Sequence, residues 1–158
     1  MSKENLNLLV LFKEKKYSQI IFIIEQIKNE EINPSLLNLS GVCRMLSSNS
    51  IETIKLAIQD FKKSYYLEED KIKSKETIKN LINASLALFD KEYIENERDL
   101  GNNFFKEINL IYQQNKKIFD NDINLMKAIS KVFKRTLDVK STIQYLRKIL
   151  NFNLDSDT

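Results

Sequence analysis

The sequence contains no histidine, and it has only one cysteine, one proline and two glycines. Without histidine, the Ser-His-Asp and Cys-His catalytic arrangements and the Glu-x-x-His ligands of di-iron bundles cannot form. The lone Cys43 cannot make an intrachain disulfide, and in its apolar stripe we expect it to be a small buried residue. Gly41 and Gly101 lie too far apart in sequence for a glycine-rich phosphate loop. We therefore expect no enzyme activity, no cofactor and no metal.

Long apolar runs are also missing. The longest, Leu8–Phe12 and Ile20–Ile24, are far short of the ~20 residues that span a bilayer. The N-terminal segment has no long apolar core before a cleavage site, so we expect no signal peptide. We therefore expect a cytoplasmic protein with no membrane association.

Apolar residues that recur at helical spacing are abundant. Gly and Pro, which form most tight turns between strands, are too few for a sheet with many turns. The clearest stretch is Pro34–Asp70, in which a polar break, Ser47–Ser50, separates two helical patterns. In the first, Gly41 marks a place where a neighbouring helix must come close. The apolar face of the second has steps of three and four, at Ile51, Ile54, Ile58, Phe61 and Tyr65.

Eight helices are expected along the chain, in four antiparallel pairs. The second helix of each pair carries a triplet at spacing four then three: Ile20-Ile24-Ile27, Ala57-Phe61-Ser64, Gly101-Phe105-Ile108 and Thr142-Leu146-Ile149. Helix pairs that recur at such intervals are typical of helical repeats, whose pairs stack side by side. We predict an all-α fold, a right-handed α-solenoid over residues 1–150, followed by a disordered polar tail at 151–158. The alternative is an ordinary helical bundle.

Several short motifs resemble the tetratricopeptide-repeat family. They are Leu37-x3-Gly41 in a first helix, Ala57-x3-Phe61 in a second helix, the run Asn80-Leu81-Ile82-Asn83-Ala84, Tyr17 and Pro34. The chain departs from the family in lacking Trp, in its longer repeat spacing, and in having no first-helix Gly in its third and fourth units. The resemblance implies helix packing and no specific chemistry.

In tetratricopeptide proteins, the first helices line a concave groove that binds peptides or partner helices. By this resemblance, the protein is expected to be an adaptor or scaffold module that binds a protein or peptide through outward polar residues of its first helices. These residues are Asn38, Asn80, Asn83, Lys127 and Lys131. Asn pairs with backbone amides, and Lys neutralises carboxylates. The alternative is that these side chains are only solvated.

Two other functions remain open at this point. From Tyr112 to Leu150, nine Lys and Arg residues against three Asp residues give a net charge of +6, which suits an acidic partner or nucleic acid. A base-stacking platform would need an exposed Phe133 among Lys131, Lys134 and Arg135, whereas the helical spacing of Phe133 favours a core position. The chain could also be the accessory N-terminal domain of a bacterial transferase, with the polar tail as a linker.

Overall fold

The computed structural model describes residues 3–28, 31–92 and 103–156, and within these ranges the chain forms nine helices and no strand. The predicted all-α class is therefore confirmed. The chain divides into two compact units, Met1–Glu69 and Asp70–Thr158, where a single repeat domain over 1–150 was expected. Each unit is described by itself. None of the described helices is long and apolar enough to cross a bilayer.

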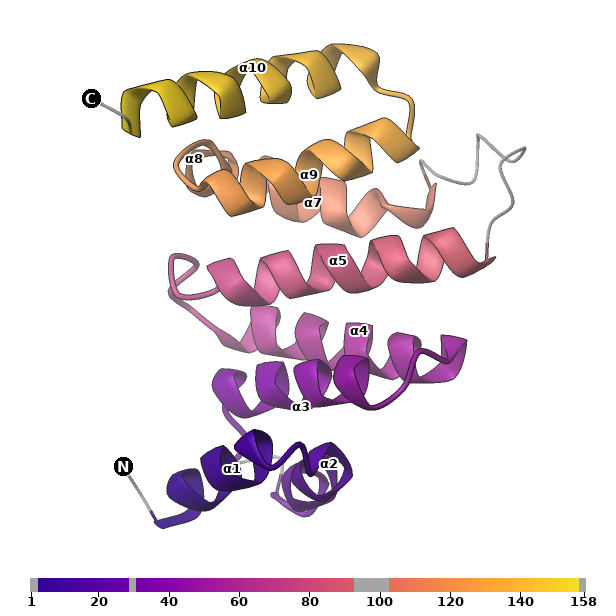
Figure 1. Cartoon of the computed structure of the whole chain (residues 1–158), viewed down its shortest axis with the longest axis vertical. Coiled ribbons are helices and arrows are strands. Elements are labelled where there is room, and N and C mark those ends of the chain that lie inside the picture. Colours follow the sequence, from indigo (N-terminus) through magenta and orange to yellow (C-terminus); the bar gives the residue numbers. More distant parts are fainter. Residues whose placement is uncertain (1–2, 29–30, 93–102, 157–158) are drawn as a thin grey trace. The chain divides into compact units, whose positions relative to one another are not determined.

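The first unit contains four helices: α1 (Lys3–Lys13), α2 (Tyr17–Glu25), α3 (Pro34–Ser47) and α4 (Ile51–Leu67). α3 and α4 form an antiparallel hairpin, and α2 packs on α3. In Figure 1, α2 is seen nearly along its axis, whereas α3 and α4 are seen from the side. α2 therefore crosses the hairpin, and the arrangement of this unit does not confirm the predicted solenoid.

The boundaries of α3 and α4 follow from capping residues. The Asn33 side chain accepts a hydrogen bond from the Leu36 N–H at 3.0 Å, and Pro34 occupies the first turn, where it has no N–H to leave unpaired. Ser50 accepts from the Thr53 N–H at 3.1 Å. The predicted break between the two helices is therefore confirmed. The sequence also suggests Ser18 as the cap of the second helix, but this prediction is wrong, because α2 begins one residue earlier, at Tyr17.

A small–large–small contact closes the α3/α4 hairpin. The ring of Phe61 lies against Gly41, where an added Cβ would be only 2.5 Å from the ring. Ala57 and Ser64, on either side of Phe61, are buried as predicted. The Ser64 hydroxyl also donates a 2.7 Å hydrogen bond to the carbonyl of Pro34, which joins the end of α4 to the start of α3.

α1 packs through a narrower face than its apolar run suggests. The apolar pattern of the first helix predicts that Leu9 and Val10 face inward. In the structure they are about half exposed, and Leu8 is buried in their place. Consecutive helical residues are ~100° apart, so three neighbours cannot all face one core. Leu8 lies in a cluster with Ile20, Ile24 and Cys43.

The second unit contains α5 (Lys75–Glu92), α7 (Lys106–Gln114), α8 (Lys116–Asp120), α9 (Ile123–Arg135) and α10 (Val139–Ser156). Ion pairs at both ends show that α5 and α9 run parallel. Near their N-termini, Lys75 lies 3.6 Å from Asp122. Near their C-termini, both nitrogens of the Arg135 fork donate to Asp90 at 2.8 Å. α9 then forms a hairpin with α10.

The sequence also predicts a helix over about residues 92–115, but its residues 93–102, among them Gly101, lie outside the described residues. Two other features of this unit differ from the prediction. A short helix that was not predicted, α8, follows a break at the buried Asn115, whose side chain donates to the Ile111 carbonyl at 2.8 Å. α10 continues to Ser156, through most of the segment expected to be a disordered tail.

The face of α10 that packs on the unit also differs from the prediction. Thr142-Leu146-Ile149 was expected to be the buried triplet, but Leu146 is 54% exposed and Tyr145 is 1% exposed. The Tyr145 ring lies among aromatic rings of two other helices, with centroids 5.8 Å from Tyr112 and 5.7 Å from Phe133. α10 is thus anchored by an aromatic residue one position before the expected one.

Candidate functional site

A groove of about 770 Å³ lies in the first unit, formed by α2, the connection to α3, α3 and α4. We call it the α2–α4 groove. Its apolar lining is Ile24, Ile27, Ile32, Leu37, Leu56, Tyr66 and Leu67, and its polar lining is Glu25, Ser40, Arg44, Gln59, Asp60, Lys62 and Lys63. Largely apolar walls with a few convergent polar groups are typical of binding sites.

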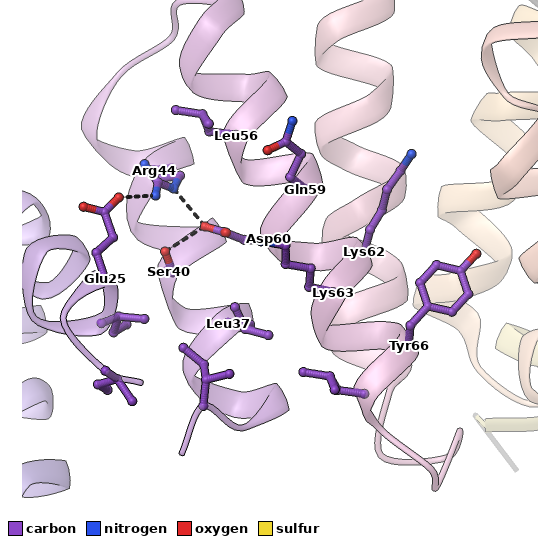
Figure 2. A pocket seen from close by; sticks show the side chains of 14 residues that line it. Glu25, Leu37, Ser40, Arg44, Leu56, Gln59, Asp60, Lys62, Lys63 and Tyr66 are labelled. Atoms are coloured by element: carbon purple, nitrogen blue, oxygen red, sulfur yellow. Dashed lines mark hydrogen bonds and ion pairs between the residues drawn. The ribbon is translucent and has the colours of Figure 1, made fainter. Parts of the chain in front are cut away.

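One arginine holds the three helices of the groove together (Figure 2). Arg44, on α3, donates from Nη2 to Glu25 of α2 at 2.7 Å and from Nε to Asp60 of α4 at 2.8 Å. The same Asp60 oxygen accepts from the Ser40 hydroxyl at 2.7 Å. The floor of the groove is therefore fixed by side chains from all three helices.

The Arg44 network is partly removed from water. The side chains of Arg44 and Asp60 are only 13% and 14% exposed, so either charge alone would carry a desolvation cost. Burial by itself would lower the pKa of Arg44, but the hydrogen bonds to Asp60 and Glu25 outweigh it and raise that pKa. Arg44 therefore stays cationic. With two carboxylates and one guanidinium, the network has a formal charge of −1.

The outer side of the groove has a different character. Gln59, Lys62 and Tyr66 lie along α4 and point away from the Arg44 network (Figure 2). Lys63, one residue further along α4, is exposed. The groove thus combines an apolar wall, an acidic floor and a rim that carries two lysines, which are features that bind amphipathic ligands.

Cys43, the single thiol, is not part of the groove. It is fully buried, as predicted, and burial raises its pKa to about 11. The protonated thiol is a weak nucleophile, so Cys43 acts here as a small core residue.

Four of the five predicted binding residues lie on the parallel helices α5 and α9. The ion pairs match Lys75 with Asp122 and Asp90 with Arg135, so residues about 46 positions apart are at the same level. Asn80 is therefore level with Lys127. Asn83, Lys127 and Lys131 are exposed, and Asn80 is partly buried. Asn38 lies on α3, in the first unit, and it lines neither hollow found there. The structure does not show one site that contains all five.

The position of the larger groove also differs from the prediction, which placed it between first helices. A hollow of about 600 Å³ does lie between the first helices α1 and α3, lined mainly by Leu8, Leu9, Phe12, Leu36 and Leu39. The α2–α4 groove is lined by the second helices α2 and α4 as well as by the first helix α3. Sequence reasoning missed its polar centre, although Ser40 and Arg44, four residues apart on one helical face, were a usable signal.

The base-stacking platform considered for the last third of the chain is wrong. Phe133 is buried, and its ring packs on Tyr112 with centroids 5.4 Å apart. Arg135 is held by Asp90. No base could stack on Phe133 without opening the core.

Comparisons of the chain with protein-family models, curated proteins and solved structures find no match. The resemblance to tetratricopeptide repeats therefore rests on the sequence motifs alone.

Proposed function

We propose that the protein is a non-enzymatic interaction module that binds a short amphipathic segment of another protein in the α2–α4 groove. The observation that carries this proposal is the groove itself, about 770 Å³ of largely apolar space around the Arg44 network. Because Glu25, Arg44 and Asp60 hold α2, α3 and α4 together, the groove is formed before a ligand arrives. A preformed site loses less conformational entropy on binding.

The lining indicates what such a segment contains. Leu56 and Leu67 border the groove from α4 while remaining about half exposed, so apolar side chains of a ligand gain by covering them. Lys62 and Lys63 favour carboxylates beside those apolar side chains. We therefore expect a segment with two or three apolar anchors and at least one acidic residue.

A random peptide library displayed on phage tests this proposal. Peptides selected on the whole chain are then measured as isolated molecules by fluorescence anisotropy. Leu56→Asp places a charge on the apolar wall and should weaken the selected peptides by about tenfold or more. Leu46→Asp is the matched control, because Leu46 is a similarly exposed leucine of α3 that does not line the groove.

Two results would contradict the groove as the binding site. One is a selection that yields only peptides insensitive to Leu56→Asp. The other is an equal loss of affinity in Leu56→Asp and Leu46→Asp, which would indicate a general effect of added charge. Circular dichroism of each variant should give the wild-type helix content and melting temperature, since both leucines are about half exposed.

The polar surface of α5 and α9 is tested with the same peptides. Asn80→Ala combined with Lys127→Ala should reduce affinity with no loss of helicity if the sequence-predicted residues take part in binding. Unchanged affinity would remove Asn80 and Lys127 from the site, and the groove would remain as the proposed binding surface.

A further inference from the structure

The last helix carries a row of exposed apolar residues with coiled-coil spacing. Val139, Ile143, Leu146 and Leu150 follow one another at steps of four, three and four, and they are between 47% and 65% exposed. This is the spacing of the a and d positions of a heptad, which form the seam between two packed helices. We call these four residues the α10 seam.

Contacts on the opposite side of α10 fix the direction in which the seam points. The Tyr145 hydroxyl lies 2.9 Å from both the Tyr112 hydroxyl and Asp120 Oδ1. Lys148 donates to the same Asp120 oxygen at 2.7 Å, and its Nζ lies 4.9 Å from the centroid of the Tyr145 ring. α10 cannot rotate to bury the seam without breaking these contacts. The seam is therefore a fixed outward feature of the second unit.

Two cations border the seam on one side. Lys140 and Arg147 are seven residues apart and occupy the flanking heptad position, where interhelical ion pairs form. Both are exposed, and among the described residues neither has a carboxylate partner. Residues 139–152 contain no Asp or Glu. A helix that packs on this seam therefore binds more favourably if it has acidic residues at the positions that face Lys140 and Arg147.

We propose that the α10 seam docks an amphipathic helix of a partner protein, with an apolar heptad seam of its own that is flanked by acidic residues. The complex is a two-helix packing of α10 and the partner helix, with carboxylates against Lys140 and Arg147. This surface is separate from the α2–α4 groove, and the inference does not depend on the groove binding anything.

A second copy of the chain fits the seam poorly. In an antiparallel pair of α10 helices, Lys140 and Arg147 of one copy would face the same cations of the other. In a parallel pair they would face Thr142 and Ile149, which offer no negative charge. An acidic helix satisfies both cations in either direction.

A lipid surface is also less suitable, because the seam is a single narrow row. Helices that lie on membranes use a broad apolar face, of the ≳ 100° width of an amphipathic surface helix. On α10 the cations Lys140 and Arg147 border the seam on one side, and the opposite side of the helix is occupied by Tyr145 and its contacts, so the apolar row cannot widen into such a face.

Designed peptides provide the test. One probe is a helical peptide of about three heptads with Ile and Leu at its seam and Glu at both flanking positions, and the other has Lys in place of Glu. Fluorescence anisotropy with the whole chain should show the Glu peptide binding about tenfold or more tighter than the Lys peptide. Lys140→Glu with Arg147→Glu should invert this preference.

The matched control is Lys106→Glu with Lys117→Glu, which makes the same charge change at exposed lysines of α7 and α8 and should leave the preference for the Glu peptide unchanged. Leu146→Asp should abolish binding of both peptides. Equal affinity for the two peptides, or a preference that the reversal at Lys140 and Arg147 does not alter, would overturn the proposal.

Two further results would assign the seam to another occupant and so overturn the proposal. One is a dimer in sedimentation equilibrium that Leu146→Asp dissociates, which would indicate a second copy. The other is co-sedimentation with vesicles of phosphatidylserine and phosphatidylcholine that Leu146→Asp removes, which would indicate a membrane. Each of these experiments can fail while the groove peptides still bind, so the two proposals are tested separately.

Discussion

The hairpins α3/α4 and α9/α10 solve the same packing problem with different residues. In the first, Phe61 is buried against Gly41, and its neighbours Ala57 and Ser64 are small. In the second, the buried aromatic residue is Tyr145, whose hydroxyl must also find partners. An apolar ring needs only space, whereas a buried hydroxyl needs hydrogen bonds.

This difference decides which face each second helix turns outward. In α4 the predicted apolar row contains the buried residues Ile54, Phe61 and Tyr65. In α10 the hydrogen bonds of the Tyr145 hydroxyl with Asp120 and Tyr112 turn Tyr145 toward the core. Leu146 is the next residue and points ~100° away around the helix. Leu146 therefore remains outside. Burial of one polar aromatic residue can therefore leave a row of apolar residues, predicted to lie in the core, exposed as a candidate interaction surface.

The largest expected effect comes from removing the aromatic ring that fills the first hairpin. Phe61→Ala should lower the free energy of unfolding by about 3–5 kcal/mol, because a ring with 1% exposure is replaced by a cavity. Urea denaturation followed by circular dichroism measures the change. Phe22→Ala is the matched control: Phe22 is 63% exposed, so its loss should cost about 0.5 kcal/mol or less. A Phe61→Ala cost near the control value would contradict the packing described for this hairpin.

Filling the space opposite the same ring should have the next largest effect. Gly41→Ala places a Cβ 2.5 Å from Cε1 of Phe61, so the ring or the helix must move. We expect a cost of about 1–3 kcal/mol, as for other overpacked cores. The cost should be larger for Gly41→Val. In a Phe61→Leu background the cost of Gly41→Ala should shrink, and a double-mutant cycle measures that coupling. Additive costs would show that the two residues do not share this space.

The second hairpin should respond to the loss of a single oxygen. Tyr145→Phe keeps the ring but leaves the buried Tyr112 hydroxyl with one partner fewer, and we expect a cost of about 1–2 kcal/mol. Leu146→Ala, one residue along, should cost about 0.5 kcal/mol or less, because Leu146 is exposed. A larger loss of stability for Leu146→Ala than for Tyr145→Phe would indicate that Leu146 is the buried residue, as predicted from sequence. The α10 seam would then not be exposed.

Local sequence signals predicted the hairpin α3/α4 well. Pro34 and the polar break before Ile51 set its boundaries, and Gly41 with Phe61 set its packing. These are short-range features, in which capping and helical spacing decide the structure. The same reasoning failed at α10, because the partners of Tyr145 come from residues 25 and 33 positions earlier in the chain.

The candidate groove was less predictable than the helices for a related reason. Arg44 reaches Asp60 across a hairpin and Glu25 across a crossing helix, and the crossing of α2 depends on tertiary packing. Asn80 is level with Lys127 in the alignment of α5 and α9 that two ion pairs mark, and no helical period predicts those pairs. Periodicity identifies which residues of a helix face a core. It does not identify which side chains of helices distant in sequence form hydrogen bonds or ion pairs with one another, and such contacts build the site.

The smallest expected effect concerns the ion pairs that hold the second unit, and it appears in acid. Hydrogen bonds from Arg135 lower the pKa of Asp90 below its usual 3.8, although burial opposes this shift. The folded carboxylate therefore binds its proton at lower pH than the unfolded one. Its contribution to stability is fully present above about pH 4, and it is lost as the pH falls through the lowered pKa of the folded state.

Asp90→Asn measures this contribution directly. For an ion pair as exposed as this one, the wild type should exceed the variant by about 0.2–1 kcal/mol in free energy of unfolding near neutral pH. The gap should close once the pH falls below the lowered pKa of folded Asp90, where the carboxyl is protonated and neutral like Asn. Urea denaturation at several pH values supplies the measurement, and high salt should reduce the gap at neutral pH. A gap that persists in acid would mean that Asp90 stabilises α5 through something other than its charge on Arg135.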